Sequence, residues 1–305
     1  MDKDLKYIEI KITVPEFTHM MQDVDSLMAK DNVPIHARPI RAIQEVYKRL
    51  GKINILMAPA DLVTDKNIFT SHNIASHISE WYDRRYGDRL KIHMGPGSVA
   101  IIIRGDAWKI LLPRIYGMVT AVCDPQIDKY KSMPMMSRGG PPPTLNILNC
   151  IENMTEQYAS QLSRQELQSI ATFFDTALCA FHAIENVASN PYITEALSDV
   201  GSAVHHIFTV PPHYGLSKWS TLQFIEKILK SYLRTKGIPS PHKHDLYVLS
   251  NIACKNGLQP LETSLIDKIK CDAGIRYGEQ VITVSEAIEA HNASINMAKI
   301  TSMQF

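Results

Sequence analysis

The sequence from Ser220 to Ala298 begins STLQFIEKILKSYLRTKG and ends VSEAIEAHNASINMA, and it decides the fold that we predict for the C-terminal half. Its first run has apolar residues at the spacing that puts them on one face of a helix. These residues are Leu222, Ile225, Ile228, Leu229, Tyr232 and Leu233. Gly237 ends this predicted helix, and Pro239 and Pro241 keep the following connection extended.

Three further helices are predicted in the same stretch. The second opens in HKHDLYVLSNIACKNG and ends at Gly257, and the third starts after Pro260. Thr283-Val-Ser-Glu286 forms a capping box for the last one, because the Ser/Thr and the Glu three residues later satisfy backbone N–H groups reciprocally. The inner faces are expected to carry Leu246, Leu249, Ile252, Ala253, Leu261, Leu265, Ile266, Ile269, Ala287, Ile288, Ile295 and Ala298.

This order of elements resembles the HEPN superfamily. The residues that carry the resemblance are the Lys236-Gly237 helix end, His244-Asp245-Leu246 at the next helix start, and Arg276-Tyr277-Gly278-Glu279 before the capped last helix. The resemblance implies an antiparallel four-helix bundle that often forms a homodimer. It also implies one of two functions, a metal-independent ribonuclease or a non-catalytic module that binds a partner or a ligand.

The sequence favours the non-catalytic function. HEPN-type cleavage needs an arginine and a histidine on one helical face with about four to six residues between them, the histidine for the 2′-hydroxyl proton and the arginine for the phosphate charge. Arg276 is too far from His291, and Arg234 is too far from His242. We therefore expect a dimeric interaction protein that binds a partner, a nucleotide or RNA. The alternative is a ribonuclease with an atypical site, acting as a defence or toxin effector.

Length and composition are those of an ordinary globular protein. At 305 residues the chain is long enough for two domains, and its formal net charge of +1 exerts no long-range attraction on nucleic acid or on acidic ligands. The five cysteines are odd in number and scattered, which is typical of free thiols in a reducing compartment. Neither a signal peptide nor a run of 18 apolar residues is found. We expect a cytoplasmic protein without a membrane partner or a cofactor.

The first 124 residues are predicted to form an α+β domain. Leu5–Val14 and Asn54–Ala58 have the composition of strands, whereas Pro15–Gly51 and Asn67–Tyr86 have helical periodicity, with a break near Pro34. Beyond them the period changes to two, which predicts an antiparallel meander with turns rich in glycine. Its four strands are expected at Leu90–Met94, Val99–Arg104, Trp108–Leu112 and Met118–Cys123.

Residues 125–144 are rich in proline and glycine and are predicted to form a linker or loop. We expect trypsin to cut the folded chain first there, at Lys129, Lys131 or Arg138. Residues 145–305 are predicted to be an all-α HEPN-like domain. Its first helix follows a capping box at Ser163 and Glu166, and another starts at Asn190-Pro191.

Two groups in the helical domain are candidate ligand sites. His242 and His244 could share a metal ion with Asp245, but we favour Asp245 or His244 as a helix cap, so no metal site is predicted. Arg276 and Tyr277 suit a phosphate or a nucleobase. The competing interpretation pairs Arg276 with Glu279 or with Asp245 in a structural ion pair.

A basic cluster in the N-terminal domain is a candidate for contact with nucleic acid. Two aromatic residues, Trp81 and Tyr82, precede it in the sequence. The cluster consists of Arg84, Arg85, Arg89 and Lys91. The competing interpretation is a solvated charged face.

Overall fold

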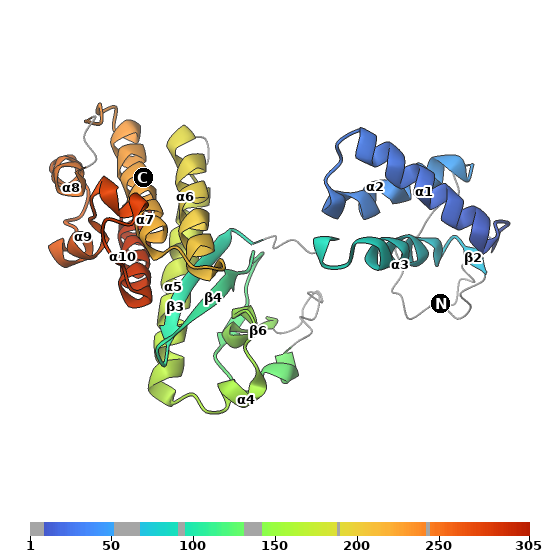
Figure 1. Ribbon diagram of the computed structural model, residues 1–305, viewed down its shortest axis with the longest axis horizontal. Helices are drawn as coiled ribbons and strands as arrows, with labels where there is room; N and C mark the ends of the chain where they lie inside the picture. Colours follow the sequence, from blue (N-terminus) through green and yellow to red (C-terminus); the bar gives the residue numbers. More distant parts are fainter. Residues whose placement is uncertain (1–8, 52–67, 91–94, 131–141, 188–189, 242–244) are drawn as a thin grey trace. The chain divides into compact units, whose positions relative to one another are not determined.

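The computed structural model describes residues 9–51, 68–90, 95–130, 142–187, 190–241 and 245–305 (Figure 1). The chain divides into two compact units, unit 1 at Met1–His93 and unit 2 at Met94–Phe305. The boundary between the units lies earlier than the domain boundary that we predicted after residue 124. The cause is the hairpin of unit 2, which packs against the helices that follow it in the sequence.

The described residues of unit 1 form three α-helices and a two-residue ladder. The ladder pairs β1 (Glu9–Ile10) with β2 (Phe69–Thr70) in antiparallel fashion. The helices are α1 (Val14–Lys30), α2 (Arg38–Arg49) and α3 (Ile74–Tyr86), with the short 3₁₀ turns η1 (Ile35–Ala37) and η3 (Gly87–Leu90). A capping box of Thr13 and Glu16 opens α1. The core contains Phe17, Met21, Val24, Met28, Ala42, Val46, Phe69, Ile74, Ile78 and Tyr82.

The predictions for unit 1 are confirmed for the helices and are less accurate for the strands. Of the strand expected at Leu5–Val14, only Glu9 and Ile10 are paired among the described residues. The helix expected from Asn67 begins at Ile74, because Phe69 and Thr70 pair with β1 instead. The strand expected at Asn54–Ala58 lies outside the described residues.

The sheet structure of unit 2 differs from a four-stranded meander. Strands β3 (Gly97–Ile103) and β4 (Asp106–Leu112) form the expected antiparallel hairpin. Strand β5 (Thr120–Val122) instead pairs in parallel with β6 (Thr144–Asn146), which comes from the end of the predicted linker. Pro113 follows β4 directly and has no backbone N–H for a ladder, so the hairpin ends there. Most of the strand expected at Leu90–Met94 lies outside the described residues.

The rest of unit 2 is mostly helical. Its helices are α4 (Glu156–Ala159), α5 (Arg164–Glu185), α6 (Pro191–Phe208), α7 (Tyr214–Thr235), α8 (Leu246–Lys255), α9 (Thr263–Ile269) and α10 (Val284–Ser302). The described part of unit 2 also contains the 3₁₀ turns η4 (Ile127–Tyr130) between β5 and β6, η5 (Ile147–Cys150) before α4, and η6 (Ala273–Tyr277) between α9 and α10. The capping boxes that open α5 and α10 are both present, and the Asn190 side chain caps α6, as predicted.

Helix α10 lies in the middle of the helical part and packs against α5, α7 and α9 (Figure 1). Tyr214 at the start of α7 shares an apolar cluster with Val284 at the start of α10. Near the other ends of these helices, the rings of Tyr232 and Phe305 are 6.1 Å apart. The two helices therefore run in the same direction.

Helix α5 is the one described helix that is long and apolar enough to cross a membrane by length and composition alone. Its residues Ile170, Phe174 and Phe181 belong to the main hydrophobic core of unit 2. Its apolar face is therefore used for packing within this unit.

Candidate functional site

A cationic side chain meets two aromatic rings on the surface of unit 2, where η6 ends. Cζ of Arg276 lies 4.4 Å from the centroid of the Trp219 ring on α7 and 5.3 Å from that of Tyr277. Both distances fall within the range of cation–π attraction, about 6 Å. Arg276 is exposed and Tyr277 is 76% exposed, so the group faces solvent. We call Trp219, Arg276 and Tyr277 the arginine stack.

The arginine stack depends on a close approach between η6 and α7. Ile275 is buried, and a Cβ added at Gly215 on α7 would stand 2.7 Å from the Ile275 carbonyl oxygen. The absence of a side chain at Gly215 therefore lets η6 lie against α7 and brings Arg276 to Trp219. Gly278 ends the turn with a φ of 77°, a conformation that glycine adopts without strain.

The guanidinium group of Arg276 has no carboxylate partner within the described part of the chain. Its Nε donates to the carbonyl oxygen of Ala273 at 3.2 Å. Glu279 lies over Gly274, where any Cβ would collide with the Glu279 carboxylate. Asp245 likewise forms no ion pair with Arg276 in the described structure, and its carboxylate accepts from backbone N–H groups at the start of α8. The terminal nitrogens of Arg276 thus remain available to an anion.

Asp245 is the cap of α8, as one of the two sequence interpretations expected. Its side chain accepts hydrogen bonds from the backbone N–H of Tyr247 at 2.9 Å and of Val248 at 3.3 Å. His242 and His244 lie outside the described residues. Among those that are described, no group of three or more His, Cys, Asp or Glu side chains could hold a metal ion.

In unit 1, the predicted basic cluster is joined to acidic side chains. Arg84 forms an ion pair with Glu80 one turn earlier in α3. Arg85 donates from Nε to Asp25 at 3.0 Å, and its Cζ lies 5.2 Å from the Trp81 ring. Arg89 is exposed, and Lys91 lies outside the described residues.

Asp25 of α1 is a buried carboxylate that joins this helix to α2 and α3. Its side chain is 3% exposed and is 3.0 Å from Nη1 of Arg38 on α2. The hydroxyl of Tyr86 donates to it at 2.6 Å, in addition to the bond from Arg85 on α3. We call Asp25, Arg38, Arg85 and Tyr86 the Asp25 network. Arg85 therefore has a structural role besides any contact with nucleic acid.

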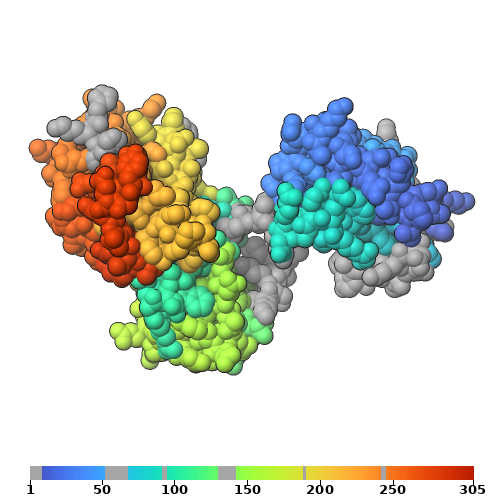
Figure 2. All heavy atoms as spheres, in the orientation of Figure 1, coloured from blue at the N-terminus to red at the C-terminus, as the bar shows by residue number. Residues whose placement is uncertain are grey.

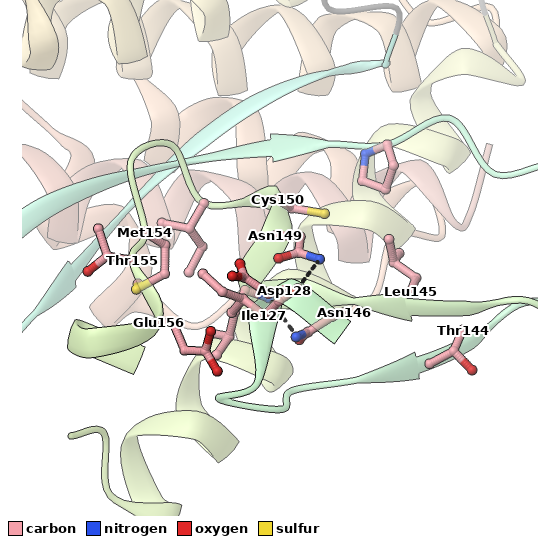
Figure 3. Close-up of a pocket in the computed structure, with 13 residues that line it drawn as sticks. Ile127, Asp128, Thr144, Leu145, Asn146, Asn149, Cys150, Met154, Thr155 and Glu156 are labelled. Atoms are coloured by element: carbon pink, nitrogen blue, oxygen red, sulfur yellow. Dashed lines mark hydrogen bonds between the residues drawn. The ribbon is translucent and has the colours of Figure 1, made fainter. Parts of the chain in front are cut away.

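A cavity of about 670 Å³ lies beside β6 and η5 in unit 2 (Figure 3). The polar amides in its wall are used internally, because Asn149 donates to the carbonyl of Ile127 and Asn146 donates to that of Asp124. Burial raises the pKa of the Cys150 thiol in this wall to about 12. A thiol with such a pKa stays protonated at neutral pH and is a poor nucleophile.

His291, the histidine that follows the arginine stack in the sequence, lies in the core of unit 2. It is fully buried, and neither of its ring nitrogens has a hydrogen-bond partner within the described part of the chain. Burial lowers its pKa to about 4. Its ring cannot reach an RNA 2′-hydroxyl, which agrees with the unsuitable sequence spacing between Arg276 and His291.

Sequence reasoning found Arg276 and Tyr277 and did not find Trp219. The Trp219 residue lies in the second turn of α7, and no local pattern relates it to η6. Comparison of the chain with protein-family models, curated proteins and solved structures finds no match.

Proposed function

We propose that this protein is a non-catalytic, HEPN-like binding protein whose arginine stack contacts a nucleotide or single-stranded RNA. The observation that carries the proposal is the exposed Arg276 guanidinium, stacked on Trp219 without a carboxylate partner among the described residues. Guanidinium groups bind phosphate with their edge, and exposed aromatic rings stack on bases. In this proposal Arg276 binds the phosphate and Tyr277 stacks on the base.

The absence of catalysis is part of the proposal. Cleavage at a 2′-hydroxyl needs a general base within hydrogen-bond reach. His291 is buried, and no other histidine has the required sequence spacing from Arg276. Burial also raises the pKa of Cys123 and of Cys271 to about 11, so these thiols are not activated nucleophiles.

We further propose that unit 2 forms a homodimer, on the basis of the HEPN resemblance. Light scattering at tens of micromolar protein is expected to give twice the mass of the chain. A monomer at that concentration would remove dimerisation from the proposal and would leave the arginine stack untouched.

RNA binding is tested by fluorescence anisotropy with a labelled single-stranded oligonucleotide. We expect Arg276→Gln to weaken binding about tenfold, because it removes a charge-assisted contact. Trp219→Phe should weaken it less, since a smaller ring still supports the guanidinium. Arg234→Gln is the matched control, because Arg234 is an exposed arginine on α7 outside the stack. Equal losses in the two arginine variants would indicate non-specific attraction and contradict the proposal.

The alternative function, a metal-independent ribonuclease, predicts a different result. The protein is incubated with total RNA and with single-stranded oligonucleotides, with and without chelator. We expect intact RNA in every sample. Cleavage that persists in chelator and is lost in Arg276→Ala would establish the ribonuclease. Cleavage lost only with chelator would instead indicate a metal at His242 and His244.

A further inference from the structure

Unit 1 contains a cavity of about 660 Å³ between α1 and α3. The two helices lie side by side on the face of unit 1 that Figure 2 shows. Phe17 and Thr18 come from α1, Trp81 and Arg84 come from α3, and Phe69 of β2 contributes to the wall between them. Pockets that hold small molecules typically measure about 300–1,000 Å³, so the volume suits one small ligand.

The wall of this cavity is aromatic. The Phe17 and Phe69 rings are stacked with centroids 4.7 Å apart, and the Phe69 and His77 rings are also 4.7 Å apart. Both phenylalanines are buried, so they are held in place by the core, whereas Trp81 is partly exposed. Phe17 and Phe69 are 5% and 2% exposed, so Trp81 supplies most of the aromatic surface that is open to a planar ring, and offset or edge-on ring pairs are favourable.

The rim of the cavity is cationic. Arg84 and Arg85 line it, and the Arg84 side chain is 71% exposed. Glu80, which pairs with Arg84, is the one carboxylate in the described wall, so Arg84, Arg85 and Glu80 together give this wall a net charge of +1. A single negative charge on a ligand would balance this excess.

We propose that the cavity between α1 and α3 binds a small planar aromatic monoanion, with its ring against Phe17, Phe69 and Trp81 and its charge at Arg84 and Arg85. This site is on unit 1 and does not depend on the function proposed for the arginine stack. It changes the interpretation of the predicted nucleic-acid cluster, because Arg84 and Arg85 of α3 line an open cavity of small-molecule size that also contains aromatic rings.

The test uses the full-length chain with Trp108→Phe and Trp219→Phe, in which Trp81 is the one tryptophan left of three. Three probes separate the requirements for ring and charge. These are 4-nitrobenzoate, its neutral analogue 4-nitrobenzamide, and acetate, which has the charge without the ring. Nitroaromatic groups quench indole fluorescence on contact. We expect saturable quenching by 4-nitrobenzoate, a linear collisional response to the amide, and no competition by acetate.

Two variants with matched controls locate the charge. Arg84→Gln should weaken 4-nitrobenzoate binding about three- to tenfold, as expected for one exposed charge-assisted contact. Arg89→Gln removes an exposed arginine that is outside the described wall and should leave affinity unchanged. Gln22→Glu adds a negative charge at an exposed position in the wall and should also weaken binding. Gln44→Glu, on the exposed side of α2, is its control.

Three results would overturn the proposal. Equal binding of the amide and the benzoate would leave an apolar pocket without anion selectivity. Equal effects of Arg84→Gln and Arg89→Gln would show that net charge, and not the cavity, attracts the probe. Linear quenching by all three probes, together with saturable quenching of Trp81 by single-stranded RNA, would instead support nucleic-acid binding by the predicted basic cluster.

Discussion

In each unit a helical segment ends with the same three residues, Arg-Tyr-Gly. The arginine of unit 1 has a carboxylate partner, and that of unit 2 has none among the described residues. Arg85-Tyr86-Gly87 ends α3 and Arg276-Tyr277-Gly278 ends η6. Both glycines have positive φ, 50° and 77°. In each case the arginine lies over a tryptophan ring, at 5.2 Å for Trp81 and at 4.4 Å for Trp219. The two segments therefore share the tripeptide and the arginine–tryptophan contact, although the ψ angles of Gly87 and Gly278 differ, at −126° and 16°.

The surroundings of the two tripeptides differ in a buried carboxylate, which is present in unit 1. Asp25 accepts from Arg85 at 3.0 Å and from the Tyr86 hydroxyl at 2.6 Å, so in unit 1 both side chains hold the helices together. Around Arg276 no carboxylate takes this place within the described part of the chain, and Tyr277 is 76% exposed. The same tripeptide is thus structural where an acidic partner is buried beside it, and is available to a ligand where none is.

The largest effect is expected from removing that partner. Asp25→Ala leaves Arg38, Arg85 and the Tyr86 hydroxyl without their acceptor, and one of these cations is nearly buried. Removing one partner of a buried ion pair typically costs about 3–5 kcal/mol. Because Arg85 is half-exposed, we expect the free energy of unfolding to fall by about 3 kcal/mol. Urea unfolding of unit 1, followed by Trp81 fluorescence in the Trp108→Phe/Trp219→Phe background, measures it.

Asp23→Ala is the control for this prediction. Asp23 lies on the same helix, its side chain is 55% exposed, and it faces His19 at 3.8 Å. Its replacement should change the free energy of unfolding by less than about 0.5 kcal/mol, as surface substitutions do. If both aspartate variants behave alike, the Asp25 network does not hold unit 1 together and the comparison between the units fails.

Acid should act on unit 2 through His291. The folded pKa of this histidine, about 4, lies below its ordinary value of 6.5, so between these values the unfolded chain binds more protons. Stability is therefore lost as the pH falls from about 6.5 toward 4, and it is retained above this window. The loss between pH 7 and pH 5 should be about 2 kcal/mol.

A variant without the titrating group tests this cause. In His291→Leu the ring is replaced by an apolar side chain, and the ring has no hydrogen bond to lose among the described residues. Urea titrations of unit 2, followed by Trp219 fluorescence, should lose most of their dependence on pH between 7 and 5. His182→Leu is the control, because His182 is exposed. An unchanged pH dependence in His291→Leu would assign the acid sensitivity to another group.

A smaller effect is expected at the start of α8. Asp245→Ala removes the acceptor for two backbone N–H groups and should cost about 1 kcal/mol. Asp272 has the equivalent position before η6 but makes no capping hydrogen bond, so Asp272→Ala is a matched control. Urea unfolding of unit 2 compares the two variants. Equal losses would mean that the negative charge, and not the capping hydrogen bonds, stabilises unit 2 at these positions.

The accurate predictions from sequence depend on local signals. Ser163 and Thr283 each open a helix with a glutamate three residues later, and Asp245 accepts from residues two and three positions on. The turn between β3 and β4 contains Gly105, in keeping with the predicted glycine-rich turns, and both Arg104 and Gly105 have positive φ, as the hairpin requires. In each case the interacting groups lie within one turn of chain, so a single sequence contains the whole signal.

The remaining features depend on contacts between distant residues. The parallel pairing of β5 with β6 crosses a stretch without periodicity, and the Trp219–Arg276 contact joins segments on two sides of α8 and α9. Asp25 lies at a position of α1 with no local partner, and its acceptor role becomes visible only when α2 and α3 are in place. The sequence therefore identified the arginines and could not show which of them was already paired.

The smallest expected change in stability distinguishes these arginines directly. Arg85→Ala should cost about 1 kcal/mol, because a hydrogen bond to the buried Asp25 is lost while Arg38 and Tyr86 remain bound to it. Arg276→Ala should change the free energy of unfolding by less than about 0.5 kcal/mol, since its one described hydrogen bond is to an exposed carbonyl. RNA affinity should respond in the reverse order, with the larger loss in Arg276→Ala. A destabilised Arg276→Ala with unchanged RNA affinity would make this arginine structural as well, and the distinction between the two tripeptides would disappear.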